Sequence, residues 1–289
     1  MKRFREVIES GQFAVTVECE PPKGTDLGPT LERAKRLAGR IHGMNVTDNQ
    51  TAVMRMAPWA VCIKLLELGI DPIFQVTCRD RNRLALQSDL LGASALGIRN
   101  ILALRGDNPD IGDHKEAKPV FDLESSQLMD VIRGLNDGHD MMGKTLKGAT
   151  EWFVGAATMP EADPIEPQLA SMEKKIKGGA QFFQTQAVYS PERVKDFVKK
   201  SAPMGARILA GIVVIKSLKM AERLNTIPGI KIPPEIMKEV EAAGEKALDR
   251  GIDIAARTIK ALRGVTAGVH IMAVGMEDRI PDILDRAGL

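Results

Sequence analysis

Three polar residues stand where β-rich apolar runs of the chain end, and their side chains suit proton transfer or the binding of a polar heterocycle. Glu18 comes just before Pro21-Pro22, Asp107 follows Arg105-Gly106, and Gln186 lies near the end of another such run. A carboxyl group at a buried strand end is partly desolvated, and desolvation favours its protonated form. Glu18 is therefore suited to donate a proton, Asp107 to bind a ring N–H or amino group, and Gln186 to make a directed amide contact.

Each of these side chains also has a purely structural interpretation. Glu18 could form an ion pair with Arg105 or a lysine, Asp107 could form an Asx turn before Pro109, and Gln186 could bond a neighbouring loop. Lys175 lies on a predicted helix and could reach a phosphate, although lysines on helix faces are commonly solvated. The four histidines lack metal-ligand spacing and the serines lack a nucleophile-elbow context, so we expect neither a metal site nor acyl-enzyme chemistry.

The elements that must position these residues alternate along the chain. Short apolar runs predict strands at residues 13–19, 44–47, 72–78, 98–104, 153–157, 181–187, 207–214 and 268–274. Apolar residues at three- and four-residue spacing predict helices at 31–41, 57–68, 81–96, 125–136, 165–177, 191–200 and 278–287. Residues 216–264 are too long for one crossover and are expected to hold the seventh helix with one or two more, one of them opened by Pro233-Pro234.

This order predicts an α/β fold, a (β/α)8 TIM barrel with extra helices after strand 7, formed by residues 1–289 as a single domain. An open doubly wound sheet is the alternative, but no GxGxxG follows the first strand. In a barrel the active site lies at the C-terminal ends of the strands, which is where Glu18 and Asp107 stand.

Composition excludes several classes of partner. The chain has 40 basic and 38 acidic residues among 289, a net charge of +2, and only 4% aromatic residues. We therefore expect no nucleic-acid partner and no strongly anionic membrane surface. The three cysteines are not closely spaced, and the longest apolar run, residues 208–215, is too short to span a membrane. These features predict a reduced, cytoplasmic protein.

The strand-end residues, in this order, resemble the methylenetetrahydrofolate reductase family over roughly the first two thirds of the chain. The matching segments are Val17-Glu18-Cys19-Glu20-Pro21-Pro22, Asn45-Val46-Thr47, Gln75-Val76-Thr77-Cys78, Leu104-Arg105-Gly106-Asp107, Gly155-Ala156-Ala157 with Pro160-Glu161, the segment 175–180 and Thr185-Gln186. The resemblance implies reduction of 5,10-methylenetetrahydrofolate to 5-methyltetrahydrofolate, with a flavin, FAD or FMN, transferring hydride from its N5 to the methylene carbon.

The resemblance also implies roles for individual residues. Glu18 matches the general acid that assists protonation at N10, Asp107 a residue that contacts both pterin and flavin, and Gln186 a pterin-binding amide. The residues that match flavin contacts are Thr47, Gln75, Arg105, Gly106, Asp107, Ala157 and, near the phosphate, Lys175.

Two departures from the family pattern affect positions that contact the electron donor and the folate. Leu224 stands where the family has a phenylalanine that stacks on NADH and pterin, and Met220 replaces a folate-binding glutamine. The donor is therefore expected to be NAD(P)H or a partner redox subunit, and an oligomer is expected. Two alternatives stay open: a non-flavin pterin-binding methyltransferase barrel, and a non-catalytic subunit of a redox complex.

Overall fold

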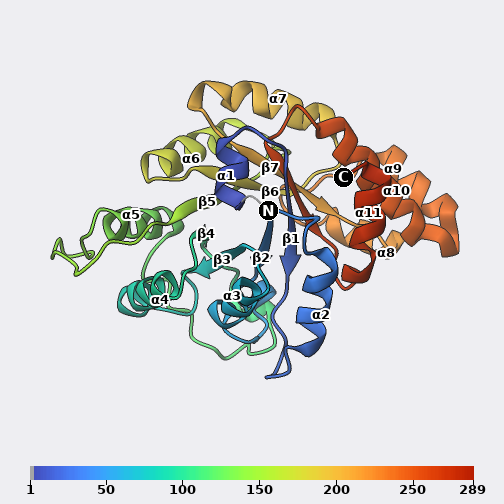
Figure 1. Cartoon of the computed structure of the whole chain (residues 1–289). Coiled ribbons are helices and arrows are strands. Elements are labelled where there is room, and N and C mark those ends of the chain that lie inside the picture. The colour runs from blue at the N-terminus through green and yellow to red at the C-terminus, as the bar shows by residue number, and fades with distance from the viewer. Residues whose placement is uncertain (1–2) are drawn as a thin grey trace.

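The computed structural model describes residues 3–289 and contains eight parallel strands that close into a barrel in sequence order, β1 pairing with β8 (Figure 1). The strands are β1 Ala14–Cys19, β2 Gly43–Val46, β3 Pro72–Thr77, β4 Asn100–Leu104, β5 Phe153–Thr158, β6 Phe182–Ala187, β7 Ile208–Val213 and β8 Gly268–Met272. Each of the eight predicted strands is present, and the closed pairing excludes the open doubly wound alternative.

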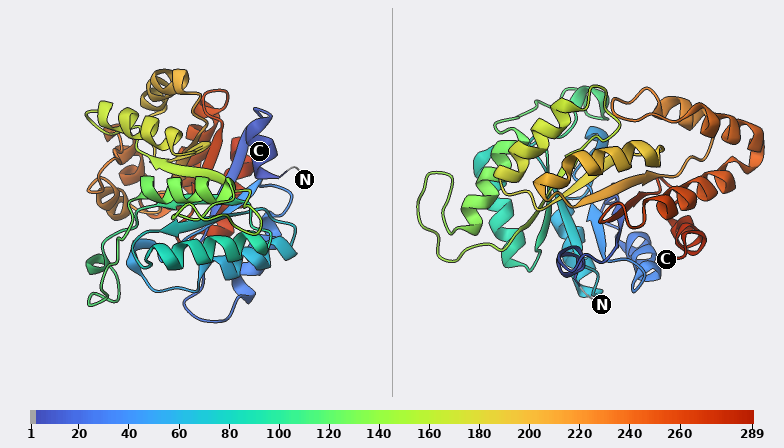
Figure 2. Two further views of the ribbon diagram at one scale, coloured as in Figure 1. Left: turned by 90° about the vertical axis from the view of Figure 1, so that its left-hand side faces the viewer. Right: turned by 90° about the horizontal axis from the view of Figure 1, so that it is seen from above.

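Helices surround the barrel. They are α1 Phe4–Glu9, α2 Gly28–Leu37, α3 Pro58–Glu67, α4 Arg83–Ala95, α5 Ser125–Asn136, α6 Glu166–Lys177, α7 Pro191–Ser201, α8 Leu218–Leu224, α9 Pro234–Ala243, α10 Ala247–Leu262 and α11 Ile280–Ala287. The extra helices predicted after strand 7 are confirmed as α8 and α9, and they extend with α10 from one side of the barrel (Figure 2). Pro233 caps α9 as predicted.

Two helix predictions need correction. The helix predicted at 31–41 begins at Gly28 and ends at Leu37, because Pro29 provides an early start and Ala38 adopts a non-helical ψ of 132°. The short helix α1 was not predicted at all. Its six residues carry too few periodic apolar positions to be recognised without the surface they pack on.

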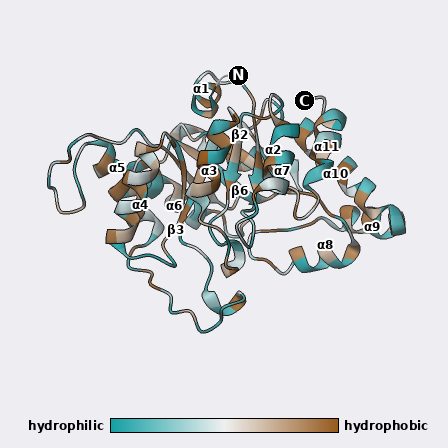
Figure 3. Cartoon of the chain, turned by 60° about the horizontal axis from the view of Figure 1, so that its bottom comes forward, coloured by the Kyte–Doolittle hydropathy of each residue, from teal (hydrophilic) through white to brown (hydrophobic). Residues whose placement is uncertain are grey.

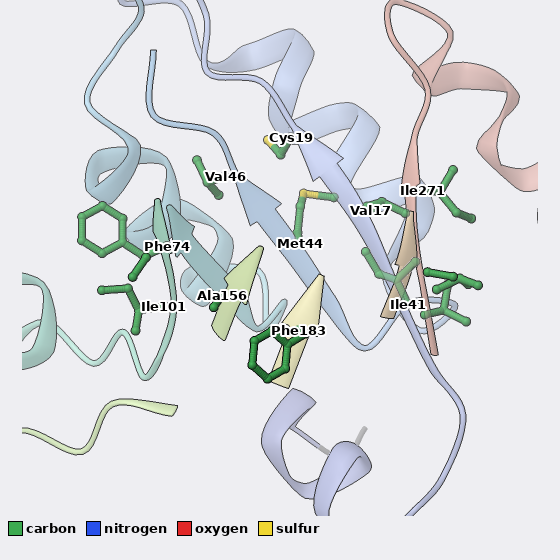
Figure 4. Close-up of a cluster of buried hydrophobic side chains, with 14 of the residues drawn as sticks. Val17, Cys19, Ile41, Met44, Val46, Phe74, Ile101, Ala156, Phe183 and Ile271 are labelled. Atoms are coloured by element: carbon green, nitrogen blue, oxygen red, sulfur yellow. The ribbon is translucent and has the colours of Figure 1, made fainter. Parts of the chain in front are cut away.

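Strand alternation divides the apolar residues into two layers. Outward-facing side chains pack between the sheet and the helices, among them Val17, Phe74, Ile101 and Phe183 (Figure 4). Inward-facing side chains at the N-terminal end of the barrel form a separate cluster with α1. Phe4 of α1 meets the rings of Phe153 and Phe182 edge-on, with centroids 5.9 and 5.1 Å away. Helix α1 therefore closes the end of the barrel opposite the expected active site.

Above this apolar layer the barrel interior becomes polar. The fully buried Thr16 and His270 face each other at 3.0 Å, and the amide of Asn45 donates to that of Gln184. Buried polar groups of this kind must find partners, and the Asn45 oxygen and His270 Nε2 have none among the described residues. Among residues 3–289, no helix is both long enough and apolar enough to cross a membrane.

Candidate functional site

A cavity of about 340 Å³ lies at the C-terminal ends of the strands, and strand termini place most of the predicted residues around it. Seven of the nine predicted site residues line this cavity: Glu18, Gln75, Arg105, Gly106, Asp107, Ala157 and Gln186. They come from five different strands or the loops that follow them. Among the predicted residues, the cavity therefore brings together two carboxylates, two amides, a guanidinium group and a glycine backbone.

Glu18 points into the barrel, on the same face of β1 as Thr16, and the side-chain amide of Gln50 lies beside it. Gln50 Nε2 is 3.4 Å from each of the two Glu18 carboxylate oxygens. The alternative interpretation, an ion pair with Arg105 or a lysine, is wrong for this structure. Arg105 instead pairs with Glu124 at 3.3 Å and covers the ring of Phe121. The carboxyl group therefore has a neutral neighbour.

Gln50 lies in a backbone segment that few side chains tolerate. Asn49, Thr51 and Ala52 have positive φ values of 47°, 52° and 56°. Such conformations cost energy and persist only where the surroundings enforce them, commonly at functional sites. Gly112 leaves room for this one, because a Cβ at that position would lie 1.9 Å from the Ala52 carbonyl oxygen.

A buried arginine also holds the loop that carries Gln50 in place. Arg79, 1% exposed, donates to the Asn49 carbonyl oxygen at 3.1 Å and pairs with Asp80 at 2.7 Å. Asn49 in turn donates to Asp80 and accepts from the Arg55 backbone N–H. This network fixes the backbone that carries Gln50.

Asp48 is a second buried charge that joins neighbouring strands near the cavity. Its carboxylate accepts from the backbone N–H and the hydroxyl of Thr77, at 2.8 and 2.9 Å, and pairs with Arg81. A buried carboxylate with several donors and a cation is held firmly in place. Sequence reasoning assigned no role to Gln50, Asp48 or Arg79, and only their positions after strands 2 and 3 could have suggested them.

The loop after β4 brings backbone and a carboxylate to the cavity. Gly106 has a φ of 88°, and a Cβ there would lie 3.0 Å from the Cβ atoms of both Arg79 and Thr77. Only glycine therefore allows this close approach. Asp107 follows as an exposed residue, and no described residue donates a hydrogen bond to its carboxylate. The Asx turn considered for Asp107 is therefore not formed.

Gln186 lies on the same face of β6 as Gln184 and lines the cavity beside a local irregularity of the strand. The pairing of β6 with β7 shifts register between Gln184 and Ala187, and the Thr185 hydroxyl accepts from the Gly211 N–H at 2.8 Å. A Cβ at Gly211 would meet the carbonyl oxygens of Thr185 and Gln186 at 2.5 and 2.7 Å. Gly211 thus makes room for the bulge, and the exposed Gln186 amide is presented to the cavity rather than to a neighbouring loop.

Two of the nine predicted residues do not line this cavity. Thr47 is buried, and its hydroxyl has no hydrogen-bond partner among residues 3–289. Lys175 reaches from α6 to the end of β5, where its Nζ donates to the Ala157 carbonyl oxygen at 2.7 Å. Burial lowers the pKa of Lys175 below its usual value of 10.5. Lys175 therefore contacts the backbone of a cavity residue instead of the cavity itself.

A smaller cavity of about 220 Å³ shares Glu18 with the first and extends past Glu20 and Arg55. Burial raises the pKa of Glu20 above 4.5, although its ion pair with Arg55 at 2.7 Å opposes that shift. Burial also raises the pKa of the Cys19 thiol to about 12, so Cys19 stays protonated near neutrality. Among residues 3–289, no group of three or more His, Cys, Asp and Glu side chains is placed to hold a metal ion.

Glu161, which belongs to the matching segment Pro160-Glu161 but was given no role from the sequence, connects three loops. Its buried carboxylate accepts from the backbone N–H groups of Tyr189, Ser190 and Lys231 at 3.2, 2.9 and 3.3 Å. Burial raises the pKa of Glu161 above 4.5 even though these donors act against the shift. Glu161 thereby attaches the segment after α8 to the barrel. Met220 and Leu224, on α8, pack against the apolar cluster of that segment.

Comparisons with known proteins agree with this geometry. A family described as methylenetetrahydrofolate reductase matches residues 3–288. "Probable methylenetetrahydrofolate reductase (NADPH)" of Caenorhabditis elegans is 25% identical over 100% of this chain and 44% of its own length. "5,10-methylenetetrahydrofolate reductase" of Salmonella typhimurium is 26% identical over 87% of this chain and 82% of its own. This chain spans less than half the length of the Caenorhabditis relative and of "Methylenetetrahydrofolate reductase 2" of Schizosaccharomyces pombe, which is 27% identical.

A solved structure supports the fold. A Clostridium thermocellum protein, described as uncharacterized and as binding two copies of 5-methyl-5,6,7,8-tetrahydrofolic acid, has a TM-score of 0.66. The match covers 98% of this chain and 96% of that one at 17% identity, so it bears on the fold alone. The family match over nearly all of the chain confirms the resemblance in the strand-end residues. This chain belongs to the methylenetetrahydrofolate reductase family.

Proposed function

We propose that this protein reduces 5,10-methylenetetrahydrofolate to 5-methyltetrahydrofolate, with residues 1–289 forming one catalytic domain. The observation that carries the proposal is the convergence of Glu18, Asp107 and Gln186 on one cavity at the barrel mouth. The family match and the names of the relatives support the reaction class.

Each of the three side chains has a role that fits its surroundings. Glu18 donates a proton to N10 as the bond between N10 and the methylene carbon breaks, which leaves an iminium cation on N5. The carboxylate of Asp107, which accepts no hydrogen bond from residues 3–289, stabilises that cation. The exposed amide of Gln186 binds the pterin ring through its donors and acceptor. Reduction then needs a hydride at the methylene carbon and yields the N5-methyl group.

The residues present fit a flavin, FAD or FMN, at this mouth. Gly106 allows the backbone to approach a bound group closely, and Thr47, outside the cavity lining, has a buried hydroxyl with no partner among the described residues. Gln75, Arg105, Gly106, Asp107 and Ala157 line the same cavity. A bound reduced flavin supplies the hydride in such a site. Lys175 lies just outside the cavity, with its Nζ on the Ala157 carbonyl oxygen, and would hold an anionic part of the cofactor where the cofactor extends past Ala157.

The electron donor is NAD(P)H or a partner redox subunit. The relatives' names include both NADH and NADPH reductases. Leu224 offers no aromatic surface on which a nicotinamide could stack, which favours delivery by a partner. Anaerobic titration of the purified protein with NADH and with NADPH separates the two cases.

The decisive experiment separates the two half-reactions. The purified protein is expected to be yellow, and the mass of the released cofactor distinguishes FAD from FMN. Glu18→Gln keeps reduction by an artificial donor, whereas folate reduction falls about 10²- to 10⁴-fold, as expected for loss of a general acid. A colourless protein that still binds methyltetrahydrofolate supports the methyltransferase alternative. If the rates of both half-reactions are unchanged in Glu18→Gln, the role of Glu18 is wrong. If the wild-type protein is inactive with every donor, the alternative of a non-catalytic subunit is supported.

A further inference from the structure

Glu18 lines two cavities of this protein. The cavity of about 340 Å³ at the barrel mouth receives the reactants in the proposed function, and the smaller cavity of about 220 Å³ extends from Glu18 past Glu20 to α2 and α11. These two helices lie side by side in Figure 3, where teal segments mark their hydrophilic residues. Nothing in the proposed reaction occupies the smaller cavity.

The proposed reaction requires Glu18 to regain a proton after each reduction. Glu18 gives one proton to N10 for each methylene group reduced, and its carboxylate must take up another before it can act again. Folate and cofactor bound in the mouth cavity cover Glu18 from that side, and Phe4, packed on Phe153 and Phe182, closes the base of the barrel. The smaller cavity gives Glu18 a route to solvent while both molecules are bound.

Glu20 stands between Glu18 and solvent along this route. Both residues line the smaller cavity, Glu18 is half-buried, and the Glu20 side chain is 44% exposed. Residues two apart in an extended chain point their side chains to the same side. Partial burial raises the pKa of Glu20, the ion pair with Arg55 opposes that shift, and the nearby charge of Glu18 adds to it. Glu20 therefore takes up a proton from solvent nearer to neutral pH than an ordinary glutamate does.

The other charged groups of the smaller cavity favour a shared proton. Besides the two glutamates, its described lining includes the carboxyl groups of Asp26 and Glu277 and the guanidinium groups of Arg33 and Arg55. Four carboxyl groups against two guanidinium groups favour the retention of a proton among the acids. The cavity has room for several water molecules, and these polar side chains supply their hydrogen-bond partners.

One loop holds both glutamates. The loop after β2 contributes Gln50, whose amide nitrogen lies 3.4 Å from the Glu18 carboxylate oxygens, and Arg55, which pairs with Glu20 at 2.7 Å. Asn49 joins the two contacts, because its side-chain oxygen accepts from the Arg55 backbone N–H at 2.9 Å. The same strained segment therefore fixes the two carboxyl groups relative to each other.

We propose that the smaller cavity is a proton inlet, through which Glu20 returns a proton to Glu18 while folate and cofactor are still bound. This inference rests on the proposed function. Glu20 takes a proton from solvent and passes it through cavity water to the Glu18 carboxylate, and Glu18 donates it to N10 in the next turnover. One proton enters for each methylene group reduced, and Glu20 ends each cycle unchanged. Glu20 touches neither substrate nor cofactor and acts only through Glu18.

Simultaneous measurement of flavin oxidation and proton uptake tests the proposal. The reduced holoenzyme is mixed anaerobically with 5,10-methylenetetrahydrofolate in weak buffer, flavin absorbance reports oxidation, and a pH indicator reports proton uptake. In the wild type, uptake should keep pace with oxidation, because the inlet works with the product still bound. In Glu20→Gln, uptake should be at least about tenfold slower than oxidation, because Glu18 then waits until the product leaves the mouth.

Three comparisons separate proton return from structural support. Glu239→Gln breaks an ion pair with Arg257, 3.1 Å long and outside both cavities, and should behave as the wild type does. Glu20→Asp keeps a carboxyl group and should restore uptake that keeps pace with oxidation. Imidazole, a small diffusible proton donor, should shorten the lag of Glu20→Gln and leave its oxidation rate unchanged.

The two signals also distinguish the inference from the function on which it rests. If uptake keeps pace with oxidation in Glu20→Gln, the inlet is overturned even where oxidation itself slows, because Glu20 then only supports the loop. If uptake lags in the wild type as well, the smaller cavity delivers no proton to the bound complex. If the folate fails to oxidise the reduced flavin of the wild type, the proposed function is wrong, and the inlet falls with it.

Discussion

The Gln50 amide nitrogen lies 3.4 Å from both carboxylate oxygens of Glu18, which makes a neutral donor the nearest polar contact of the proposed acid. A neighbouring cation would strongly favour the charged form of the carboxyl group, whereas a neutral amide donor orients it with a weaker preference for that form. The strained segment at Asn49, Thr51 and Ala52 fixes where this amide stands. We infer that Gln50 positions Glu18.

Gln50→Ala should therefore slow the folate half-reaction about tenfold, the effect of losing roughly 1.4 kcal/mol of transition-state stabilisation. Reduction by an artificial donor should stay unchanged, because Glu18 takes no part in it. Gln50→Glu places a second carboxyl beside Glu18 and should shift the pH profile of the folate half-reaction to higher pH. Stopped-flow measurement of the two half-reactions from pH 5 to 9 checks both variants. Equal loss in both half-reactions would contradict a positioning role.

Lys175→Met should stabilise the cofactor-free protein while weakening cofactor binding. Burial lowers the pKa of Lys175, so the unfolded chain binds more protons than the folded one between the lowered value and 10.5. The stability of the wild type therefore rises with pH through that window. The gain in Lys175→Met should be largest at neutral pH and shrink toward pH 10.5. Thermal melts across pH measure it, and a variant less stable at pH 7 would refute the argument.

Glu161→Ala should loosen the segment after α8 from the barrel. The change leaves the backbone N–H groups of Tyr189, Ser190 and Lys231 without their carboxylate acceptor, at a cost of about 1–3 kcal/mol. Hydrogen exchange should accelerate most at these three amides. Glu192→Ala, on the exposed surface of α7, is the control and should leave all three protected. If hydrogen exchange accelerated equally throughout the barrel, Glu161 would stabilise the whole fold and not this segment in particular.

Gly106→Ala should lower both stability and cofactor affinity. Its positive φ costs about 1–2 kcal/mol for any other residue, and the new Cβ would press on Arg79 and Thr77 at 3.0 Å. Gly148→Ala is the matched control, because Gly148 has a φ of 104° and open space around its Cβ position. The difference in melting temperature between the two variants measures the destabilisation caused by the crowded Cβ at position 106. Cofactor affinity should change only in Gly106→Ala, and equal affinities in the two variants would contradict the role of Gly106.

Periodicity was sufficient to predict the strands and most helices, because the strands of the barrel are buried on both faces. The predicted helix at 125–136 coincides with α5, Ser125–Asn136, whose apolar face repeats regularly. Strand ends then located Glu18, Asp107 and Gln186 at the cavity. Closure itself depends on the register between β1 and β8, which no local pattern encodes.

The supporting residues could not be predicted because their partners are distant in sequence. Glu161 bonds the Lys231 backbone, and Asp48 bonds Thr77 and Arg81, contacts that exist only once the loops are placed. Gln50 depends on a left-handed backbone that nothing in its residue type demands. Lys175 was predicted near a phosphate, and its bond to the Ala157 carbonyl oxygen could not be anticipated from its place on a helix.

Helix α1 gives the barrel the form of a cup with one rim. Phe4, wedged against Phe153 and Phe182, closes the base, so nothing can pass through from end to end. Whatever binds deep in the interior must leave by the way it came, and a second molecule stacked above the first blocks its exit. When two molecules are bound in the interior at once, the one that entered last must therefore leave first.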